Sequence, residues 1–303
     1  MPDNRTILGT THSVVGFDVP KGTVDCHVHV FGPPARFPYS MTRVYTPAVA
    51  SIDDLVALER ALGIDRIVIV HPSPYGTDNA CSLDALAGLG RRGIAARMVA
   101  VIDPSIDDAD LEAMHAAGVR GARLNLETTG VRDPAIARHL LQVTAERVAP
   151  LGWHLQTFTN LAVLAALEDA ILALPLPLVV DHMAHCRAGE GLAQRHMDVL
   201  VRLVASGKVF VKLSGAYRVS DRPDYADVDD IARALIAAGP DRMVWGSDWP
   251  HVGGPRGAEH RDEVQPFLAI DDGVQLDALA RWAPDAVLRR KILLDTPARL
   301  YDF

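Results

Sequence analysis

Short runs of apolar and β-branched residues alternate along the chain with longer segments whose apolar residues recur every three or four positions. The short runs are typical of buried β-strands, and the longer segments are typical of amphipathic helices. This alternation predicts eight strands, each followed by helical sequence. The predicted strands span residues 23–30, 65–73, 95–103, 119–126, 152–158, 178–185, 208–215 and 242–250.

Three of the helical segments carry clear boundary signals. They are "SIDDLVALERALG" (51–63), "SIDDADLEAMHAAG" (105–118) and "DVDDIARALIAAG" (227–239). Each begins with Ser or Asp, whose side chains cap the first turn of a helix, and each ends on Gly, which suits the residue after the last turn. We therefore expect helices over these three ranges.

The repeated order of strand and helix favours one fold class. Eight such units over about 280 residues are typical of a closed (β/α)₈ TIM barrel, an α/β fold. An open doubly wound sheet is the alternative, but no glycine-rich phosphate-binding pattern follows any of the strands. We expect an N-terminal arm over residues 1–22 and a single catalytic barrel over residues 23–303.

Composition and charge narrow the possible partners. The chain has a formal net charge of -8, which argues against binding to nucleic acid or to an anionic membrane surface. No stretch reaches the roughly 20 apolar residues of a membrane span, and no apolar leader follows the first residues. Cys26, Cys81 and Cys186 have neither disulfide-framework nor zinc-ribbon spacing. We expect a cytoplasmic protein; no pattern in the sequence predicts an oligomeric state.

In a TIM barrel the active site lies where the strands end and the following loops begin. The ends of the eight predicted strands are rich in polar and titratable residues, which are poorly suited to filling a barrel core. These residues are His27, His29, His71, Ser73, Asp103, Arg123, Asn125, Gln156, His182, His185, Lys212, Ser214, Asp248 and His251.

The stretch "TVDCHVHVFG" (23–32) holds two histidines two positions apart. Side chains alternate along a strand, so His27 and His29 point the same way. Two converging imidazoles suit a divalent metal, or they polarise a substrate oxygen without one. His182, where the run "LVVDHMAH" leaves its strand, and Asp248, in "VWGSDWPH", are expected at the same mouth.

These residues carry a resemblance to a known family. The paired histidines of the first strand, the histidine of the sixth and the aspartate ending the eighth resemble the amidohydrolase superfamily. More narrowly, "DCHVHVFGPPARFPYS", "YTP", "LGIDRIVIVHPSPYGTDN", "GVRGARLNL", "KLSGAYR" and "GSDWPH" are similar to the branch of 2-pyrone-4,6-dicarboxylate lactonases. The resemblance implies a TIM barrel that hydrolyses the ring ester of a small anionic lactone.

Residues on two strands bear on the question of a metal. Binuclear amidohydrolases take ligands from the ends of the fourth and fifth strands, where this chain has Arg123 and Gln156. A guanidinium places a fixed positive charge beside the site, which disfavours a divalent cation. The lactonase branch is also metal-independent. We expect no cofactor; the alternative is a zinc ion on His27, His29, His182 and Asp248.

The resemblance implies a role for each site residue. Asp248 is expected to act as general base toward water, and His27, His29 and His182 to stabilise the oxygen of the lactone carbonyl. Arg123 and Arg218 are expected to bind a substrate carboxylate through their forked guanidinium groups. Further predicted substrate-binding residues are Tyr45, Ser73, Thr77, Asn79, Gln156 and Arg132.

Other functions remain open at this stage. The same branch contains sugar-acid lactone isomerases, and a zinc-dependent amidohydrolase or decarboxylase and a non-catalytic binding barrel are further alternatives. The sequence departs from the branch at "NLETTGVRD" (125–133) and in the loop 251–263. The sequence therefore supports lactone hydrolysis as the reaction more strongly than it supports any particular lactone as the substrate.

Overall fold

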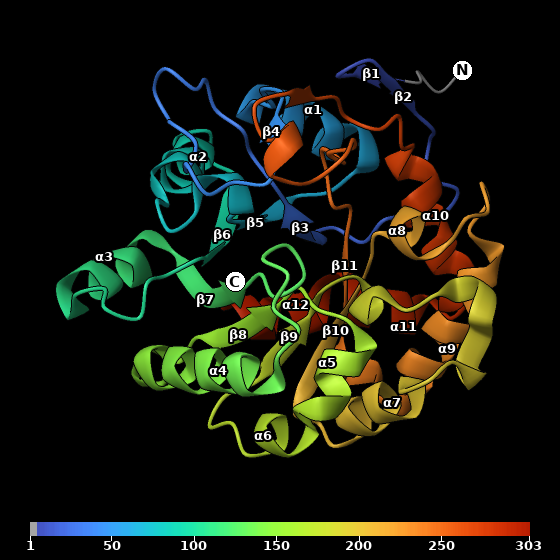
Figure 1. Ribbon diagram of the computed structural model, residues 1–303. Helices are drawn as coiled ribbons and strands as arrows, with labels where there is room; N and C mark the ends of the chain where they lie inside the picture. The colour runs from blue at the N-terminus through green and yellow to red at the C-terminus, as the bar shows by residue number, and fades with distance from the viewer. Residues whose placement is uncertain (1–4) are drawn as a thin grey trace.

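A parallel eight-stranded sheet forms the centre of the molecule (Figure 1). The structure is a computed structural model, and it describes residues 5–303. Each strand pairs with the next one in the barrel sequence, as in a TIM barrel, and all eight predicted strands are confirmed within their predicted ranges. The strands are β3 (Val24–Val28), β5 (Arg66–Val70), β6 (Ala95–Ala100), β7 (Val119–Leu124), β8 (His154–Thr157), β9 (Leu178–Val180), β10 (Val209–Ser214) and β11 (Met243–Gly246).

The barrel closes where β11 meets β3. The backbone N–H of Asp248 donates to the carbonyl of His27 at 2.9 Å, and the N–H of His29 donates to the carbonyl of Trp249 at 2.9 Å. A Cβ atom on Gly246 would lie 2.7 Å from the Cβ of His27, so this close approach of the two strands requires glycine. Closure thus makes the first and the last predicted site segments neighbours.

Helices surround the sheet (Figure 1). Their amphipathic faces cover the outward side chains of the strands, which are almost completely buried. The α-helices of the described residues are α1 (Ile52–Leu62), α2 (Ala80–Arg91), α3 (Asp108–Ala117), α4 (Pro134–Val148), α5 (Leu161–Ala166), α6 (Glu168–Leu172), α7 (Met197–Ala205), α8 (Ala216–Val219), α9 (Asp229–Ala238), α10 (Asp272–Trp282), α11 (Ala286–Arg290) and α12 (Thr296–Tyr301).

The three helices predicted from their boundary signals exist, but only α1 has the predicted ends. Ser51 caps α1 in a capping box, and Gly63 follows it with φ 75°. Helix α3 is capped by Asp107, two residues later than predicted, because Ser105 donates its backbone N–H and its hydroxyl to the side chain of Asp103. Helix α9 begins at Asp229, and Gly239 follows it with φ -163°, so it does not form a left-handed cap.

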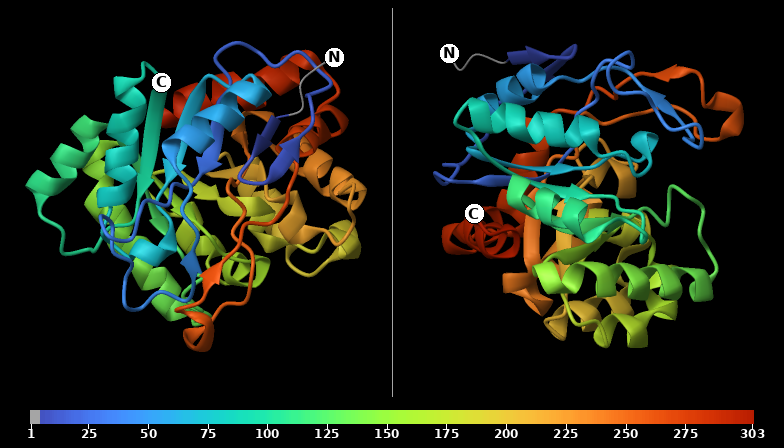
Figure 2. Two further views of the ribbon diagram at one scale, coloured as in Figure 1. Left: turned by 90° about the horizontal axis from the view of Figure 1, so that it is seen from above. Right: turned by 90° about the vertical axis from the view of Figure 1, so that its left-hand side faces the viewer.

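The two ends of the barrel are built differently. In the right-hand view of Figure 2 the C-terminal helices, in red, lie on one side, while the loops after β3 (blue), β7 (green) and β11 (orange) project on the other. A two-stranded sheet of β4 (Thr46–Pro47) and β12 (Val264–Gln265) joins the first and the last of these loops. Long loops therefore surround the carboxyl ends of the strands, where the site residues were predicted.

The N-terminal arm includes a small hairpin of β1 (Arg5–Ile7) and β2 (Thr10–His12). Beyond the hairpin, the backbone N–H of Ser13 donates to Asp271 at 2.9 Å, and that of Gly16 donates to Asp277 at 2.6 Å. These bonds fasten the arm to the N-terminal half of α10. The arm therefore packs on the outside of the barrel, away from the sheet interior.

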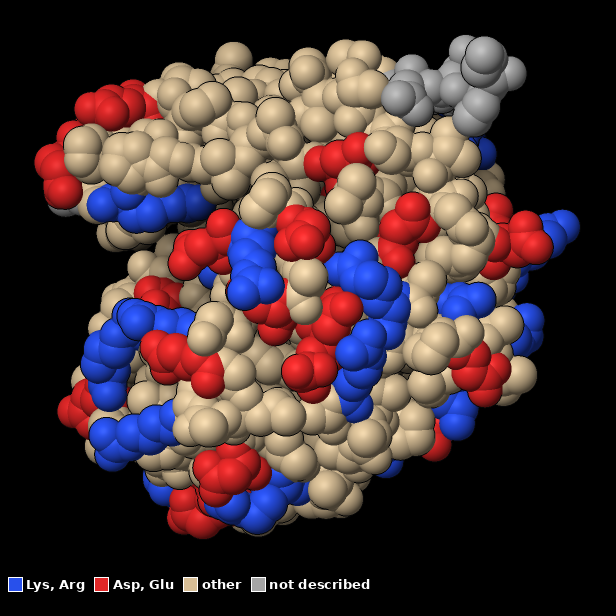
Figure 3. Space-filling view, turned by 90° about the vertical axis from the view of Figure 1, so that its right-hand side faces the viewer, with Lys and Arg blue, Asp and Glu red and all other residues tan. Residues whose placement is uncertain are grey.

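On the face drawn in Figure 3, basic and acidic side chains are interspersed, and neither sign forms a continuous patch. An extended basic patch is what a nucleic-acid backbone requires, and this face lacks one. None of the helices within residues 5–303 is long and apolar enough to cross a lipid bilayer.

Candidate active site

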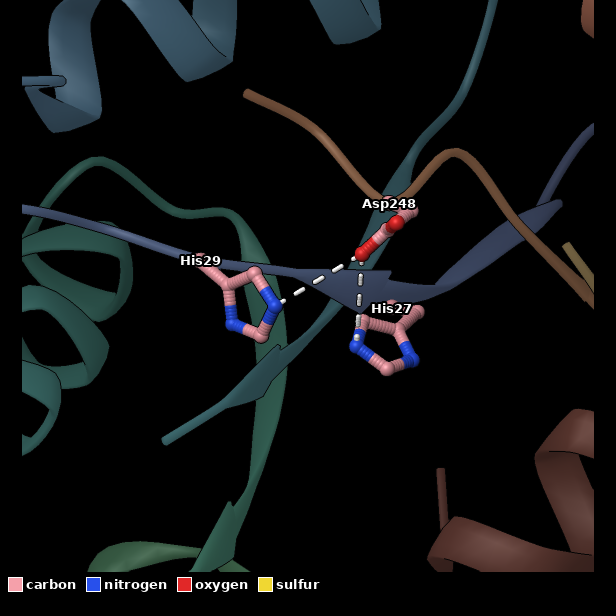
Figure 4. A group of neighbouring side chains, drawn as sticks. All are labelled: His27, His29 and Asp248. Carbon is pink, nitrogen blue, oxygen red and sulfur yellow. Dashed lines mark ion pairs between the residues drawn. The ribbon is translucent and has the colours of Figure 1, made fainter. Parts of the chain in front are cut away.

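Four predicted residues meet at the carboxyl end of the barrel. His27 lies within β3 and His29 just beyond it, and both side chains point into the barrel mouth as their spacing predicts. Asp248 follows β11 and faces both imidazoles (Figure 4). His182 lies in the turn that follows β9. The φ of His182 is 49° and the φ of Asp248 is 68°, and residues other than glycine rarely adopt such positive values.

The carboxylate of Asp248 is the centre of the cluster. Its Oδ1 atom lies 3.6 Å from Nε2 of His29 and 3.7 Å from Nε2 of both His27 and His182. Its Oδ2 atom accepts hydrogen bonds from the Tyr217 hydroxyl at 2.6 Å and from Nε of Arg218 at 2.5 Å. Thus Oδ2 is held by the protein and Oδ1 has no hydrogen-bond partner among residues 5–303.

The charge states of this cluster follow from burial and from neighbouring cations. Burial acts to raise the pKa of Asp248, but the Arg218 guanidinium and the neighbouring histidines together outweigh it and hold that pKa well below its usual range. Burial lowers the pKa of His29, and it lowers that of His182 to about 3. The site at neutral pH therefore combines an ionised carboxylate with uncharged imidazoles.

The partner of each Nδ1 atom decides which ring nitrogen carries the hydrogen. Nδ1 of His29 lies 2.7 Å from the carbonyl oxygen of Val70, which can only accept, so Nε2 of neutral His29 bears a lone pair. Nδ1 of His182 lies 2.9 Å from Oγ of Ser214. This imidazole is the only hydrogen-bond partner of the Ser214 hydroxyl within the described residues. Nε2 of the same ring faces Oδ1 of Asp248 at 3.7 Å, and an ionised carboxylate can only accept. The favoured tautomer of His182 therefore carries its hydrogen on Nε2, with the Ser214 hydroxyl donating to Nδ1.

His27 is controlled by a buried lysine. Nζ of Lys212, which can only donate, lies 3.3 Å from Nδ1 of His27, and this contact favours the tautomer with the hydrogen on Nε2. Asp181 also lies 3.3 Å from this Nδ1, but its Oδ1 accepts no hydrogen bond from the described residues. His27 itself is fully buried behind Asp248. Its N–H therefore faces Asp248 and not the open space of the site.

Beneath the histidines lies a buried polar network centred on Asp181. Arg123 donates to its Oδ2 from Nε at 3.0 Å and from Nη2 at 2.9 Å, and Gln156 donates to the same oxygen at 3.1 Å. Lys212 donates to Oε1 of Gln156 at 2.8 Å. Such a network is stable because each buried charge has an opposite charge and hydrogen bonds beside it. Gln156 was predicted to bind substrate. The structure places it beneath the site, where it supports Asp181 and Lys212 through hydrogen bonds.

A cavity of about 300 Å³ opens above Asp248, and seven of the predicted residues line it. The predicted residues that line it are His29, Tyr45, Ser73, Arg123, His182, Arg218 and Asp248. His185, named from the sequence as a strand-end residue without an assigned role, also lines it. The other residues lining it are Val44, Pro72, Glu127, Thr128, Phe158 and Arg256.

Four of the predicted substrate-binding residues lie outside the lining of this cavity: Gln156, described above, and Thr77, Asn79 and Arg132. The side chain of Asn79 is bonded to the backbone of Thr77 and Val101, so it braces the loop after β5. Thr77 and Asn79 line a separate hollow between α2 and α3. Arg132 donates at 2.7 Å to each carboxylate oxygen of Glu127, so its charge is matched within its own loop.

A model of the amidohydrolase family matches residues 24–303, the whole barrel from its first strand. The chain belongs to the amidohydrolase family. This amidohydrolase is 36% identical to the 4-sulfomuconolactone hydrolase of Rhizobium radiobacter, with 95% of this chain and 92% of the relative covered. It is 37% identical to the 2-pyrone-4,6-dicarboxylate hydrolase of Comamonas testosteroni, with 94% and 92% covered.

A solved structure gives the same result for the fold. It is that of a Pseudomonas putida protein provisionally named 2-pyrone-4,6-dicarboxylic acid hydrolase. It superposes on this amidohydrolase with a TM-score of 0.78 at 31% sequence identity, covering 94% of this chain and 98% of the other. The family resemblance and the TIM barrel expected from the sequence are therefore confirmed.

Some members of the amidohydrolase superfamily hold a metal, so the fit of this site to zinc matters. Nε2 of His27, Nε2 of His29 and Oδ1 of Asp248 lie close enough together to be considered as ligands. Their spacing of 3.6–3.7 Å approaches the separation of about 3.3 Å expected between ligands of a tetrahedral zinc ion. Nε2 of His29 offers the lone pair that a metal needs.

Two features of the same site do not fit a metal. Lys212 favours the tautomer in which the Nε2 atom that His27 would have to offer carries the hydrogen, and metal ligands must be unprotonated. The side chains of Lys212, Arg123 and Arg218 also place three positive charges around two carboxylates, Asp181 and Asp248. This surplus of positive charge disfavours a divalent cation.

Sequence reasoning missed several residues of the amidohydrolase site. Asp181 directly precedes His182, and its position at the end of a buried strand is a signal that was available. Tyr217 directly precedes Arg218 and was passed over in the same way. Arg256 lies in an irregular loop, and no periodicity or motif places it in the cavity.

Proposed function

We propose that this lactonase of the amidohydrolase family opens the ring ester of a small carboxylated lactone such as 2-pyrone-4,6-dicarboxylate. One observation carries the proposal: an ionised carboxylate, Asp248, faces neutral imidazoles in a cavity that three guanidinium groups also line. Two relatives that are more than a third identical are named as lactone hydrolases, which supports the same reaction.

Water is activated between two acceptors. Oδ1 of Asp248 and the lone pair of His29 Nε2 are 3.6 Å apart, and a water molecule can donate one hydrogen to each of them. Its own lone pair then points toward the cavity, where the lactone carbonyl binds. Asp248 takes the proton as the water attacks, which is general base catalysis. His27 holds its Nε2–H toward Asp248 and orients the carboxylate.

The carbonyl oxygen needs a hydrogen-bond donor as it gains negative charge. His182 lines the cavity and presents Nε2–H to it, because Ser214 occupies its other ring nitrogen. A neutral donor fixed in position in this way stabilises an oxyanion without a metal. The ring C–O bond then breaks, and the departing oxygen receives the proton that Asp248 took from water.

Two of these guanidinium groups, those of Arg123 and Arg218, lie beside the catalytic cluster and are available to a substrate carboxylate. Arg123 uses Nε and Nη2 on Asp181, and Arg218 uses Nε on Asp248, so Nη1 of each remains without a carboxylate partner in the part of the chain described. Both residues line the cavity. Their remaining N–H groups are therefore placed to bind a carboxylate of the substrate.

The test of the function is product analysis on a panel of carboxylated and neutral lactones. We expect the protein to open 2-pyrone-4,6-dicarboxylate or a close carboxylated analogue with release of one acid equivalent per ring, and to act poorly on neutral lactones. Formation of an isomeric lactone without acid release would instead identify an isomerase. Equal kcat/KM for a neutral lactone and its carboxylated analogue would show that Arg123 and Arg218 do not bind a substrate carboxylate.

We also propose that the reaction needs no metal, because Lys212 and the surplus of cations oppose one. The purified protein is expected to hold well under one equivalent of zinc, manganese or iron by elemental analysis, and prolonged chelation is expected to leave kcat unchanged. A stoichiometric metal whose removal abolishes turnover and whose return restores it would contradict this. It would make His27, His29, His182 and Asp248 ligands.

A further inference from the structure

The charges that line the cavity are balanced in all but one case. Arg123 is paired with Asp181, Arg218 with Asp248, and Glu127 with Arg132. Arg256 lines the same cavity with an exposed side chain, and none of the ion pairs within residues 5–303 includes it. Its guanidinium is therefore the uncompensated positive charge of the cavity lining, and an anion entering the site is attracted to it.

The guanidinium of Arg256 is held in place without an acid. Its carbon lies 3.7 Å from the ring centroid of Tyr45, and its Nη2 donates to the carbonyl of Val252 at 2.9 Å. Tyr45 is itself buried and lines the cavity. Stacking on an aromatic face leaves the edge of the guanidinium, with its remaining N–H groups, open to a ligand.

The loop that carries Arg256 is fastened to the loop that carries Tyr45. The backbone N–H of Gly257, the next residue, donates to the carbonyl of Val44 at 2.9 Å. Farther along, Arg43 pairs with Asp262 at 2.6 Å, and the hydroxyl of Thr46 donates to the carbonyl of Arg261 at 2.5 Å. These contacts position the guanidinium over the cavity before any substrate arrives.

We infer that Arg256 binds a second anionic group of the substrate, remote from the ester that is cleaved, and makes the enzyme selective for lactones with two anionic groups. This inference rests on the proposed function. The first anionic group is bound by Arg123 and Arg218, which line the cavity closer to the buried charges of Asp181 and Asp248. A carboxylate or a sulfonate satisfies Arg256 equally, since both offer two oxygens to a forked donor.

The test crosses enzyme variants with matched substrates. The substrates are 2-pyrone-4,6-dicarboxylate and the two monocarboxylates, 2-pyrone-4-carboxylate and 2-pyrone-6-carboxylate. The variants are Arg256→Met, Arg256→Lys and, as a control with the same change of charge, Arg138→Met. Arg138 pairs with Asp169 on the outside of the barrel and does not line the cavity.

We expect the wild type to prefer the dicarboxylate over at least one monocarboxylate by more than tenfold in kcat/KM. Arg256→Met is expected to reduce that preference at least tenfold by slowing the dicarboxylate and leaving the monocarboxylate nearly unchanged. Arg256→Lys keeps the positive charge but loses the paired N–H donors of the guanidinium, so its preference should fall between those of the wild type and Arg256→Met. Arg138→Met should match the wild type.

Two results would overturn the inference while leaving the proposed function intact. In one, Arg256→Met slows the dicarboxylate and both monocarboxylates by the same factor, which indicates a structural role. In the other, it changes none of them. If the wild type opens no carboxylated lactone at all, the proposed function fails, and the role of Arg256 fails with it.

Discussion

Replacing Asp248 by Asn is expected to lower kcat by at least about 100-fold, the usual worth of a positioned general base. The amide is nearly the same size as the carboxylate, and its oxygen can still accept from Tyr217 and Arg218 as Oδ2 does now. What is lost is the anion that takes the proton from water. The measurement is steady-state turnover of the lactone, with folding followed by circular dichroism and substrate binding by calorimetry.

Asp103 gives a matched control for this substitution. It follows the end of β6, as Asp248 follows the end of β11, but it is exposed, and within residues 5–303 its side chain accepts only from Ser105. Asp103→Asn should retain wild-type turnover. An Asp248→Asn enzyme with more than about a tenth of the wild-type kcat would show that another group accepts the proton, because general bases contribute far more than that.

Replacing His182 by Ala is expected to lower kcat by about 100- to 1,000-fold with little change in KM, because removal of one oxyanion donor has that effect. The structure assigns the donor through Ser214, whose hydroxyl fixes the hydrogen on Nε2 of His182. The N–H strengthens its bond only as the carbonyl oxygen becomes negative. The loss should therefore fall on the chemical step and not on substrate binding.

His71 separates a catalytic loss from a structural one. It is also a buried histidine at a strand end, and its Nδ1 also contacts a hydroxyl, that of Ser82 at 2.9 Å, but it does not line the cavity. His71→Ala is expected to lower the free energy of unfolding while the folded fraction keeps its kcat. If His182→Ala loses only stability, as His71→Ala does, His182 is not the oxyanion donor.

The position of the strands followed from the sequence because strand formation depends on local pattern. The run "TVDCHVHV" shows both the strand and the common direction of His27 and His29, since side chains alternate with a period of two. The end of the eighth run likewise placed Asp248 at the mouth of the barrel. Once eight parallel strands are recognised, barrel geometry brings their carboxyl ends together.

Helix ends were less accessible to sequence reasoning. Ser105 is a residue type that often caps a helix. In this structure its backbone N–H and its hydroxyl both donate to the side chain of Asp103, and these two hydrogen bonds form a turn instead of a helix cap. Both outcomes use the same polar groups, so their sequence signals overlap. The loops were harder still: nothing in "HVGGPRGAEHRDE" indicates that Arg256 stacks on Tyr45, more than 200 residues earlier.

The sequence by itself thus determined the barrel, the family and the four residues at its mouth. Only the tertiary structure decided which atoms of those residues face each other. It places Arg218 against Asp248, Lys212 and Ser214 against the Nδ1 atoms of His27 and His182, and Gln156 beneath the site. The physical reason is that strand formation and the direction of side chains along a strand depend on residues that are neighbours in the sequence. The charge of a carboxylate, the tautomer of a histidine and the lining of the cavity depend on groups that meet only when the barrel closes.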